Sequence, residues 1–505
     1  MATGGHGAGT RLESGEVATR TARGVVWAYG SYVGGRVLVL LATAILARLL
    51  TPADFGLVAL ALIFTALLDT VKDLGLTQSL MVAPDEELPE RAQTAFVFSV
   101  AIGALLAGIV AALSPLAAGF FDEPELVGIL SALGANFFLR ALSSTHYALA
   151  QKRIDFRVRS AAEFTDVLVR GGTGIGLALA GAGAWSLVAG YLAGTVALTT
   201  TLWVLVPWRP SLRPRLAHLR QMLGFGGTLT AIDVASAVIS NVDYLFVGRV
   251  LGTSALGLYT LGYRLPELLV YNLSVVAGMV LFPAFAALDR SALKRAFLVS
   301  LRYTLMLALP IATALAILAE PFVFAAFGDQ WSGAVPAMQV LSLFALAVTV
   351  AVPAGTVYKA IGRPGIILWL ALPRAVLLVI AVALFVDEGI VAVAACQAAV
   401  ALLFDVVGLA LASRLLEVGG RAILAELWPS VLGTAVMAAA LVPIDLAIAS
   451  PWLSLAAAAV AGVALYGAIL WLFARDAVRG LLGSLSPRLA HPGDVLASPK
   501  PDAPA

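Results

Sequence analysis

Apolar segments of about twenty residues recur along nearly the whole chain, and no stretch joining two of them is much longer than about fifteen residues. A transmembrane α-helix needs about 20 mostly apolar residues to cross the hydrocarbon core of a bilayer. Proline, glycine and charged residues divide the 505-residue chain into fourteen such segments. We therefore predict an all-α, polytopic membrane protein with no room in its loops for a soluble catalytic domain.

Composition supports the same fold class. Hydrophobic residues make up 61% of the chain and charged residues 12%, whereas a soluble domain carries about 25% charged residues. A net charge of +2 is too small to indicate nucleic acid as a partner. The single cysteine, Cys396, excludes an internal disulfide, and the four histidines lie far apart with no carboxylate or thiol at ligand spacing. We expect no metal and no cofactor.

The distribution of lysine and arginine predicts the orientation of the chain. If the amino terminus is cytoplasmic, nearly all the basic residues of the loops lie on the cytoplasmic side, and only Arg48 and Arg249 lie outside. This bias requires an even number of spans and places both termini in the cytoplasm. The predicted parts are a disordered amino terminus (1–22), an N-lobe of six spans (23–206), a linker (207–220), a C-lobe of six spans (221–415), a last pair of spans (426–474) and a disordered tail (475–505).

An internal repeat indicates how the spans are organised. The turn after the first span contains Arg48 and Gly56, and the turn after the seventh contains Arg249 and Gly257 in the same pattern, 201 residues later. Since six spans separate the copies, the two halves have the same orientation, as in transporters with parallel repeats. Arginines that merely reach the headgroups beside a compact hairpin would give the same pattern, so a functional role of the arginines stays open. Two lobes imply a cleft between them.

The second copy of this turn lies in a longer stretch, Asn241 to Pro266, which resembles the central signature of the Wzx-type oligosaccharide flippases. Ala47–Gly56, Asp73–Leu80, Gly183–Leu187 and Leu281–Ala286 are similar to other segments of that family. These flippases form the polysaccharide transport branch of the superfamily that includes multidrug and toxin extruders and lipid II flippases. The resemblance covers roughly residues 20 to 415.

The resemblance implies a V-shaped pair of six-helix bundles with two extra carboxy-terminal helices. It implies alternating access and export of an undecaprenyl-diphosphate-linked oligosaccharide from the cytoplasmic to the outer face of the bacterial plasma membrane. The implied partners are this lipid-linked substrate, membrane lipids and the glycan polymerase or glycosyltransferase machinery. No covalent chemistry is expected of such a carrier.

Charged side chains inside the spans are the candidate site residues. Arg36, Arg170 and Arg374 lie about ten to twelve residues, or roughly 15 to 18 Å, from the cytoplasmic ends of their spans. A charge at the bilayer centre is costly and normally faces a partner or a water-filled cavity. Because guanidinium groups bind phosphate oxygens and keep their proton, we expect these three, with Arg140 and Arg264 as secondary members, to line a cationic cleft for the diphosphate.

Structural ion pairing is the alternative for several of these charges. Arg264 is three residues from Glu267 and Arg170 is four residues from Asp166, so each can pair along its own helix. An ion-driven carrier also needs an acid that changes protonation or holds a cation, and the candidates are Asp69, Asp166 and Asp243. For Asp243 the favoured interpretation is a cap or a partner for Arg249 at the repeated turn.

Two other functions are compatible with a polytopic chain. A glycan polymerase or ligase would need a sizeable outer loop with reactive groups, and the predicted outer loops are short. A multidrug extruder of the same superfamily would favour an acidic cleft for cationic drugs, and the deep arginines disfavour it.

Overall fold

The computed structural model describes residues 34–72, 76–153, 155–211, 214–215 and 240–485, and these residues are almost entirely helical. No strand occurs within these ranges. Ten helices in the described part of the chain are long and apolar enough to cross a membrane. The chain is therefore an all-α, multi-pass membrane protein, as predicted, while the number of fourteen spans stays a prediction.

Packing between helices divides the chain into two compact units. Unit 1 comprises Met1–Leu49 and Phe64–Val234, and unit 2 comprises Leu50–Ile63 and Ala235–Ala505. This division differs from the predicted lobes at the start of the second span, which packs with unit 2.

Unit 1 is built from antiparallel helix pairs. α4 packs along α5, α6 packs along α7, and α5 also contacts α7. Small residues allow this close approach: a Cβ added at Gly190 of α7 would lie only 2.7 Å from the carbonyl oxygen of Arg170 in α6. Its described helices are residues 34–49, the end of α2 (Pro52–Lys72), α3 (Leu76–Val82), α4 (Leu88–Phe121), α5 (Leu126–Lys152), α6 (Phe156–Leu179) and α7 (Ala184–Leu205).

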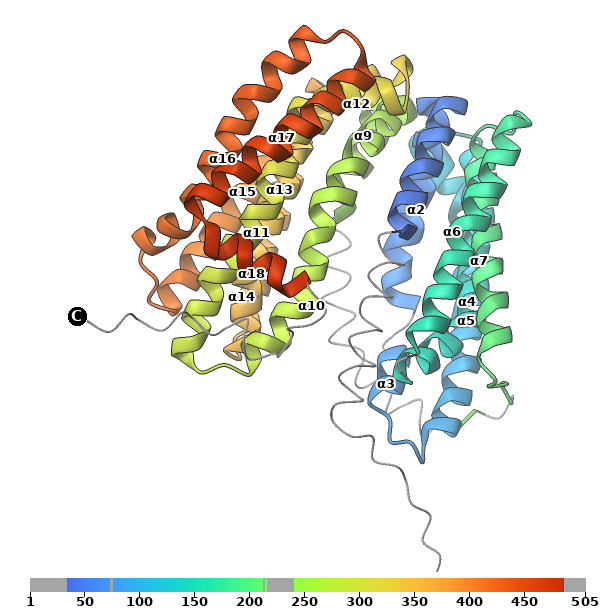
Figure 1. The fold of residues 1–505 in the computed structure, drawn as a ribbon. Coiled ribbons are helices and arrows are strands. Elements are labelled where there is room, and N and C mark those ends of the chain that lie inside the picture. The colour runs from blue at the N-terminus through green and yellow to red at the C-terminus, as the bar shows by residue number, and fades with distance from the viewer. Residues whose placement is uncertain (1–33, 73–75, 154, 212–213, 216–239, 486–505) are drawn as a thin grey trace, which may run out of the picture. The chain divides into compact units, whose positions relative to one another are not determined.

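Unit 2 is organised around α13, which contacts α9, α10, α11 and α15. The last two long helices, α16 and α17, lie side by side, and α16 packs against α11 (Figure 1). Its described helices after residue 246 are α9 (Gly252–Pro266), α10 (Asn272–Ala286), α11 (Arg290–Ile317), α12 (Ala319–Ala326), α13 (Val335–Ala360), α14 (Gly365–Phe385), α15 (Ile390–Leu415), α16 (Gly420–Ala447), α17 (Pro451–Phe473) and α18 (Arg475–Leu485).

The two copies of the repeated turn contact each other reciprocally within unit 2. A Cβ added at Gly56 of α2 would lie 1.7 Å from the carbonyl oxygen of Thr253, and one added at Gly257 of α9 would lie 1.8 Å from that of Pro52. Pro52 and Thr253 are themselves equivalent positions, 201 residues apart. The repeat read from the sequence is thus a pair of equivalent backbone-to-backbone contacts that only glycine permits.

The predicted eighth span, near 255–283, is not one regular helix. α9 ends at Pro266, the π-helical turn η2 (Glu267–Tyr271) follows, and α10 begins at Asn272. Proline removes a backbone donor and favours such a break. The side-chain amide of Asn272 donates to the Glu267 carbonyl at 3.0 Å, which satisfies an acceptor of the widened turn. A second π-helical turn, η1 (Val247–Leu251), precedes α9.

The prediction of disorder from residue 475 onward is wrong for 475–485, which form α18. Ala477 of α18 is buried against Met306 and Leu470, and its carbonyl accepts a hydrogen bond from the hydroxyl of Tyr303. The apolar residues of this segment follow helical spacing and find a partner surface on α11 and α17. The sequence alone did not show that surface.

Candidate functional site

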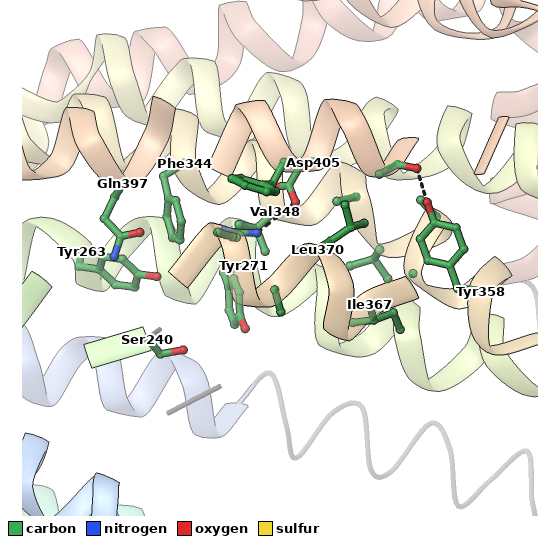
Figure 2. A pocket seen from close by; sticks show the side chains of 18 residues that line it. Ser240, Tyr263, Tyr271, Phe344, Val348, Tyr358, Ile367, Leu370, Gln397 and Asp405 are labelled. Atoms are coloured by element: carbon green, nitrogen blue, oxygen red, sulfur yellow. Dashed lines mark hydrogen bonds and ion pairs between the residues drawn. The ribbon is translucent and has the colours of Figure 1, made fainter. Parts of the chain in front are cut away.

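A cavity in unit 2 lies among the membrane-spanning helices and has a volume of about 400 Å³. α13, α14 and α15 form much of its wall, with contributions from Ser240, α9 and η2 (Figure 2). Most of the lining is apolar. The polar side chains that face the cavity are Ser240, Tyr263, Tyr271, Tyr358, Arg374, Gln397 and Asp405.

A buried ion pair lies in the wall of this cavity. Arg374 Nη1 of α14 is 3.2 Å from Asp405 Oδ1 of α15, and the two side chains are 19% and 14% exposed. Asp405 Oδ2 has no hydrogen-bond partner. Arg374 is one of the three deepest predicted arginines, but the structure pairs it with a carboxylate 31 residues away on the neighbouring helix. Its charge is therefore balanced within the protein.

Aromatic rings and an amide surround this ion pair. Tyr263 packs against Phe344 with ring centroids 5.7 Å apart. In the view of Figure 2 Gln397 lines the same end of the cavity. At the other end the hydroxyl of Tyr358 donates a hydrogen bond to the backbone carbonyl of Gly408. The aromatic rings give the cavity an apolar wall, and the amide of Gln397 and the neutralised ion pair add a few polar groups to it.

Asp243 does not cap the repeated turn as predicted. Its side chain is completely buried, and its Oδ2 accepts a hydrogen bond from the hydroxyl of Tyr259 at 2.7 Å. Oδ1 has no hydrogen bond, although the side chain of Gln397 lies nearby. Arg249 is exposed, whereas Asp243 is completely buried. The sequence analysis placed Asp243 near the outer end of a span. In the structure the helix that carries Asp243 packs this side chain into the interior of unit 2.

The deep arginine of unit 1, Arg170, is also paired. Its Nη2 lies 2.7 Å from Asp166 Oδ2 one turn earlier on α6, and its guanidinium stacks over the ring of Tyr191 at 4.3 Å. Gly194 of α7 leaves room for the carboxylate, because a Cβ there would be 2.4 Å from Asp166 Oδ1. This pairing matches the local alternative given by the sequence.

The remaining predicted arginines differ in their surroundings. Arg264 pairs with Glu267 at 3.2 Å, as its spacing predicts. Arg140 is half-buried on α5 and forms no hydrogen bond or ion pair through its side chain with the described part of the chain. Arg36 is half-buried on helix 34–49, which packs against α6 where Ala42 approaches Gly171.

The structure therefore distributes the predicted cationic set between the two units. Arg36, Arg140 and Arg170 belong to unit 1, and Arg264 and Arg374 belong to unit 2. Whether they form one cleft stays a prediction. At the repeated turn, Arg48 and Arg249 are both exposed.

Asp69 lies within α2, and its side chain is outside the part of the structure that can be described. In the described ranges, no group of three or more His, Cys, Asp or Glu side chains could hold a metal ion.

The aromatic residues and Gln397 were not singled out from the sequence. Tyrosines at 263 and 271 and a glutamine in an apolar span are unusual enough to mark a polar interior surface, and that signal was present.

Comparison with known sequences finds relatives whose names refer to the biosynthesis of polysaccharides. A family model described as polysaccharide biosynthesis protein matches residues 45–336. The chain is 30% identical to the succinoglycan biosynthesis transport protein ExoT of Rhizobium meliloti, over 73% of this chain and 74% of that protein. It is 25% identical to the teichuronic acid biosynthesis protein TuaB of Bacillus subtilis, over 63% of this chain and 67% of that protein. It is 28% identical to the lipopolysaccharide biosynthesis protein WzxC of Escherichia coli, over 63% of this chain and 65% of that protein.

Comparison with solved structures concerns the fold alone, because the sequence identities are low. The lipid II flippase MurJ in an inward closed conformation superposes with a TM-score of 0.73 at 16% identity, over 90% of this chain and all of that chain. An inward-facing multidrug transporter of the MATE family gives a TM-score of 0.59 at 16% identity, over 76% of this chain and 94% of that chain.

Proposed function

The chain belongs to the family of polysaccharide biosynthesis proteins and is a membrane transporter rather than an enzyme; from this premise we propose that it flips an undecaprenyl-diphosphate-linked oligosaccharide. The proposed direction is from the cytoplasmic to the outer face of the bacterial plasma membrane, by alternating access. On the outer face the glycan polymerase machinery would receive the product. Both termini lie in the cytoplasm in this proposal.

The observation that carries the proposal is a cavity that presents a few polar side chains inside an otherwise apolar bundle. Polar side chains within membrane helices are costly and normally serve a substrate or ion. The cavity of unit 2 places Arg374, Gln397 and three tyrosines among apolar residues, as a ligand site with few convergent polar groups does. A membrane transporter of polysaccharide biosynthesis must move sugars and their carrier lipid past such groups.

The diphosphate needs positive charge that is not already neutralised. We propose Arg140 as its principal ligand, roughly 18 Å from the cytoplasmic end of its span. Arg36 belongs to the proposed set through its depth alone. Arg140 shares its charge with no carboxylate in the described ranges. Arg170, Arg264 and Arg374 already contact acids and would bind phosphate only by exchanging these partners. Ion coupling through Asp69, Asp166 or Asp243 is part of the proposal.

Transport of the purified chain in sealed vesicles tests the function. Wild-type protein should move lipid-linked oligosaccharide to the opposite leaflet, where an added glycosidase releases the sugar. Arg140→Gln should lower this rate about tenfold or more, since a charge-assisted hydrogen bond contributes about 1.5 to 3 kcal/mol. Arg157→Gln, an exposed arginine in the first turn of α6, is the matched control and should transport normally.

Three results would each count against a part of the proposal. Wild-type vesicles that leave the lipid-linked oligosaccharide in its original leaflet would overturn the flippase function. Normal transport by Arg140→Gln at equal protein levels would remove Arg140 from the phosphate site. Rates that do not respond to either a proton or a sodium gradient would remove the ion-coupling role of the three acids.

A further inference from the structure

We infer that the cavity of unit 2 is a sugar subsite, which takes one neutral sugar ring of the oligosaccharide and does not take the diphosphate. This inference rests on the proposed function and divides the substrate between two places. The sugar lies against the aromatic wall of unit 2, and the diphosphate lies against arginines outside this cavity.

The charge balance of the cavity argues against a diphosphate there. Among the described residues that line the cavity, Arg374 and Asp405 are the only ones with a formal charge, and they pair with each other at 3.2 Å. A diphosphate bound to the remaining N–H groups of Arg374 would place its negative charges beside the Asp405 carboxylate, which is unfavourable. A diphosphate that displaced Asp405 from Arg374 would leave a buried carboxylate without its partner, which is strongly unfavourable. A neutral ligand avoids this penalty.

The wall chemistry matches a sugar ring. A pyranose presents C–H faces that pack on aromatic rings and hydroxyl groups that need donors and acceptors at its edge. Tyr263, Tyr271 and Phe344 supply rings, and Gln397 supplies an amide with two donors and one acceptor. The hydroxyl of Tyr263 has no hydrogen-bond partner in the described part of the chain, so it can serve a ligand.

The ion pair itself can also serve a hydroxylated ligand. Arg374 donates a hydrogen bond to Asp405 through Nη1, and its other N–H groups have no partner among the described residues. A paired guanidinium donates to a sugar hydroxyl without requiring a negative charge. The volume of about 400 Å³ is near the lower end of ligand sites and suits a single ring better than a whole oligosaccharide.

Binding measurements on the purified full chain in nanodiscs test this inference. The probes are inorganic pyrophosphate and the free oligosaccharide released by mild acid from the host's own lipid-linked pool. Titration calorimetry should show oligosaccharide binding by the wild type. Tyr263→Phe and Gln397→Leu should each weaken it about fivefold, because each removes the hydrogen bonds of one side chain and keeps its bulk. Gln339→Leu, an exposed glutamine of α13 outside the cavity, is the control and should bind like wild type.

A charge variant provides the sharper comparison. Asp405→Asn leaves Arg374 without its counter-charge, so it should raise the affinity of the chain for pyrophosphate about tenfold while oligosaccharide affinity changes less. Thermal unfolding of each variant establishes that it is folded.

Each outcome separates the sugar subsite from the flippase function. Oligosaccharide affinity that is unchanged in both Tyr263→Phe and Gln397→Leu would overturn the sugar subsite, even if vesicles still transport the lipid-linked substrate. The sugar subsite would also be overturned if Gln397→Leu, with Arg374 and Asp405 both unchanged, weakened the binding of pyrophosphate. Absence of transport by wild-type vesicles would instead count against the proposed function.

Discussion

The reciprocal glycine contact gives the most direct prediction for stability. Gly257→Ala places a methyl group 1.8 Å from the carbonyl oxygen of Pro52 on α2. Ordinary van der Waals contact begins near 3.4 Å, so α2 and α9 must separate locally by about 1.6 Å. The main-chain atoms on the other side of the contact cannot rotate away as a side chain would.

The expected loss of stability follows from the packing around this contact. Leu60 and Leu256 are completely buried beside it, and a gap of this size forfeits much of the dispersion energy of such side chains. Overpacking of a close contact costs about 1 to 3 kcal/mol. We expect Gly257→Ala to lower the free energy of unfolding by an amount in that range. Gly56→Ala should act alike, and the double variant should cost less than the sum, because one separation relieves both clashes.

Reversible unfolding in mixed micelles, followed by tryptophan fluorescence, measures these changes. Gly467→Ala is the matched control, since this helical glycine of α17 is exposed and has no neighbour within 4 Å of an added Cβ. It should leave stability unchanged or raise it slightly. A Gly257→Ala variant as stable as the wild type would refute the reasoning. Losses that add fully in the double variant would show that the two contacts are independent.

Three further variants test single contacts in the same assay. Tyr466→Phe removes a hydrogen bond of 2.7 Å to a backbone carbonyl of α11 and should lower stability by about 1 kcal/mol; no loss would contradict this. His146→Phe should be neutral or stabilising, because neither buried ring nitrogen has a hydrogen-bond partner, and a clear loss would show that the imidazole is bound. The Ala292 N–H and the Ser291 hydroxyl donate to the Asp289 carboxyl and lower its pKa below the ordinary 3.8. The ionised carboxyl therefore stabilises α11 above pH 3.8, and this stabilisation is lost as pH falls through the lowered pKa of the folded state. Asp289→Asn should lack this acid-dependent loss, and an unchanged pH profile would contradict the assignment.

Local features of the fold could be predicted from the sequence. The apolar segments predicted most helices, since length and composition determine whether a helix can cross a bilayer. Pairs three or four residues apart, such as Arg264 with Glu267, follow from helix geometry alone. The repeat of Gly56 at Gly257 predicted equivalent turns. That the two glycines face each other depends on how two helices pack, which no single segment encodes.

Non-local features of the candidate site could not be predicted in this way. Arg374 meets Asp405 only because α14 and α15 pack with a particular rotation, and the sequence gives no register for that contact. The same limit applies to Asp243, whose partner Tyr259 lies on the far side of the irregular turn η1. The sequence identifies these charged residues, but the partners of Arg374 and Asp243 belong to tertiary structure.

The π-helical turn η2 determines which tyrosines share the cavity. Tyr271 follows Tyr263 by eight positions, and at about 100° per residue an unbroken α-helix would set the two rings roughly 80° apart around its axis. One extra residue in the turn rotates everything after it back by about 100°, which leaves the rings roughly 20° apart. Both therefore line the cavity. A substitution that restored regular α-helical hydrogen bonding here without changing the chain length would swing Tyr271 away by about 100° while every cavity side chain kept its identity, so the backbone geometry of this turn can alter ligand preference as effectively as a substitution in the lining.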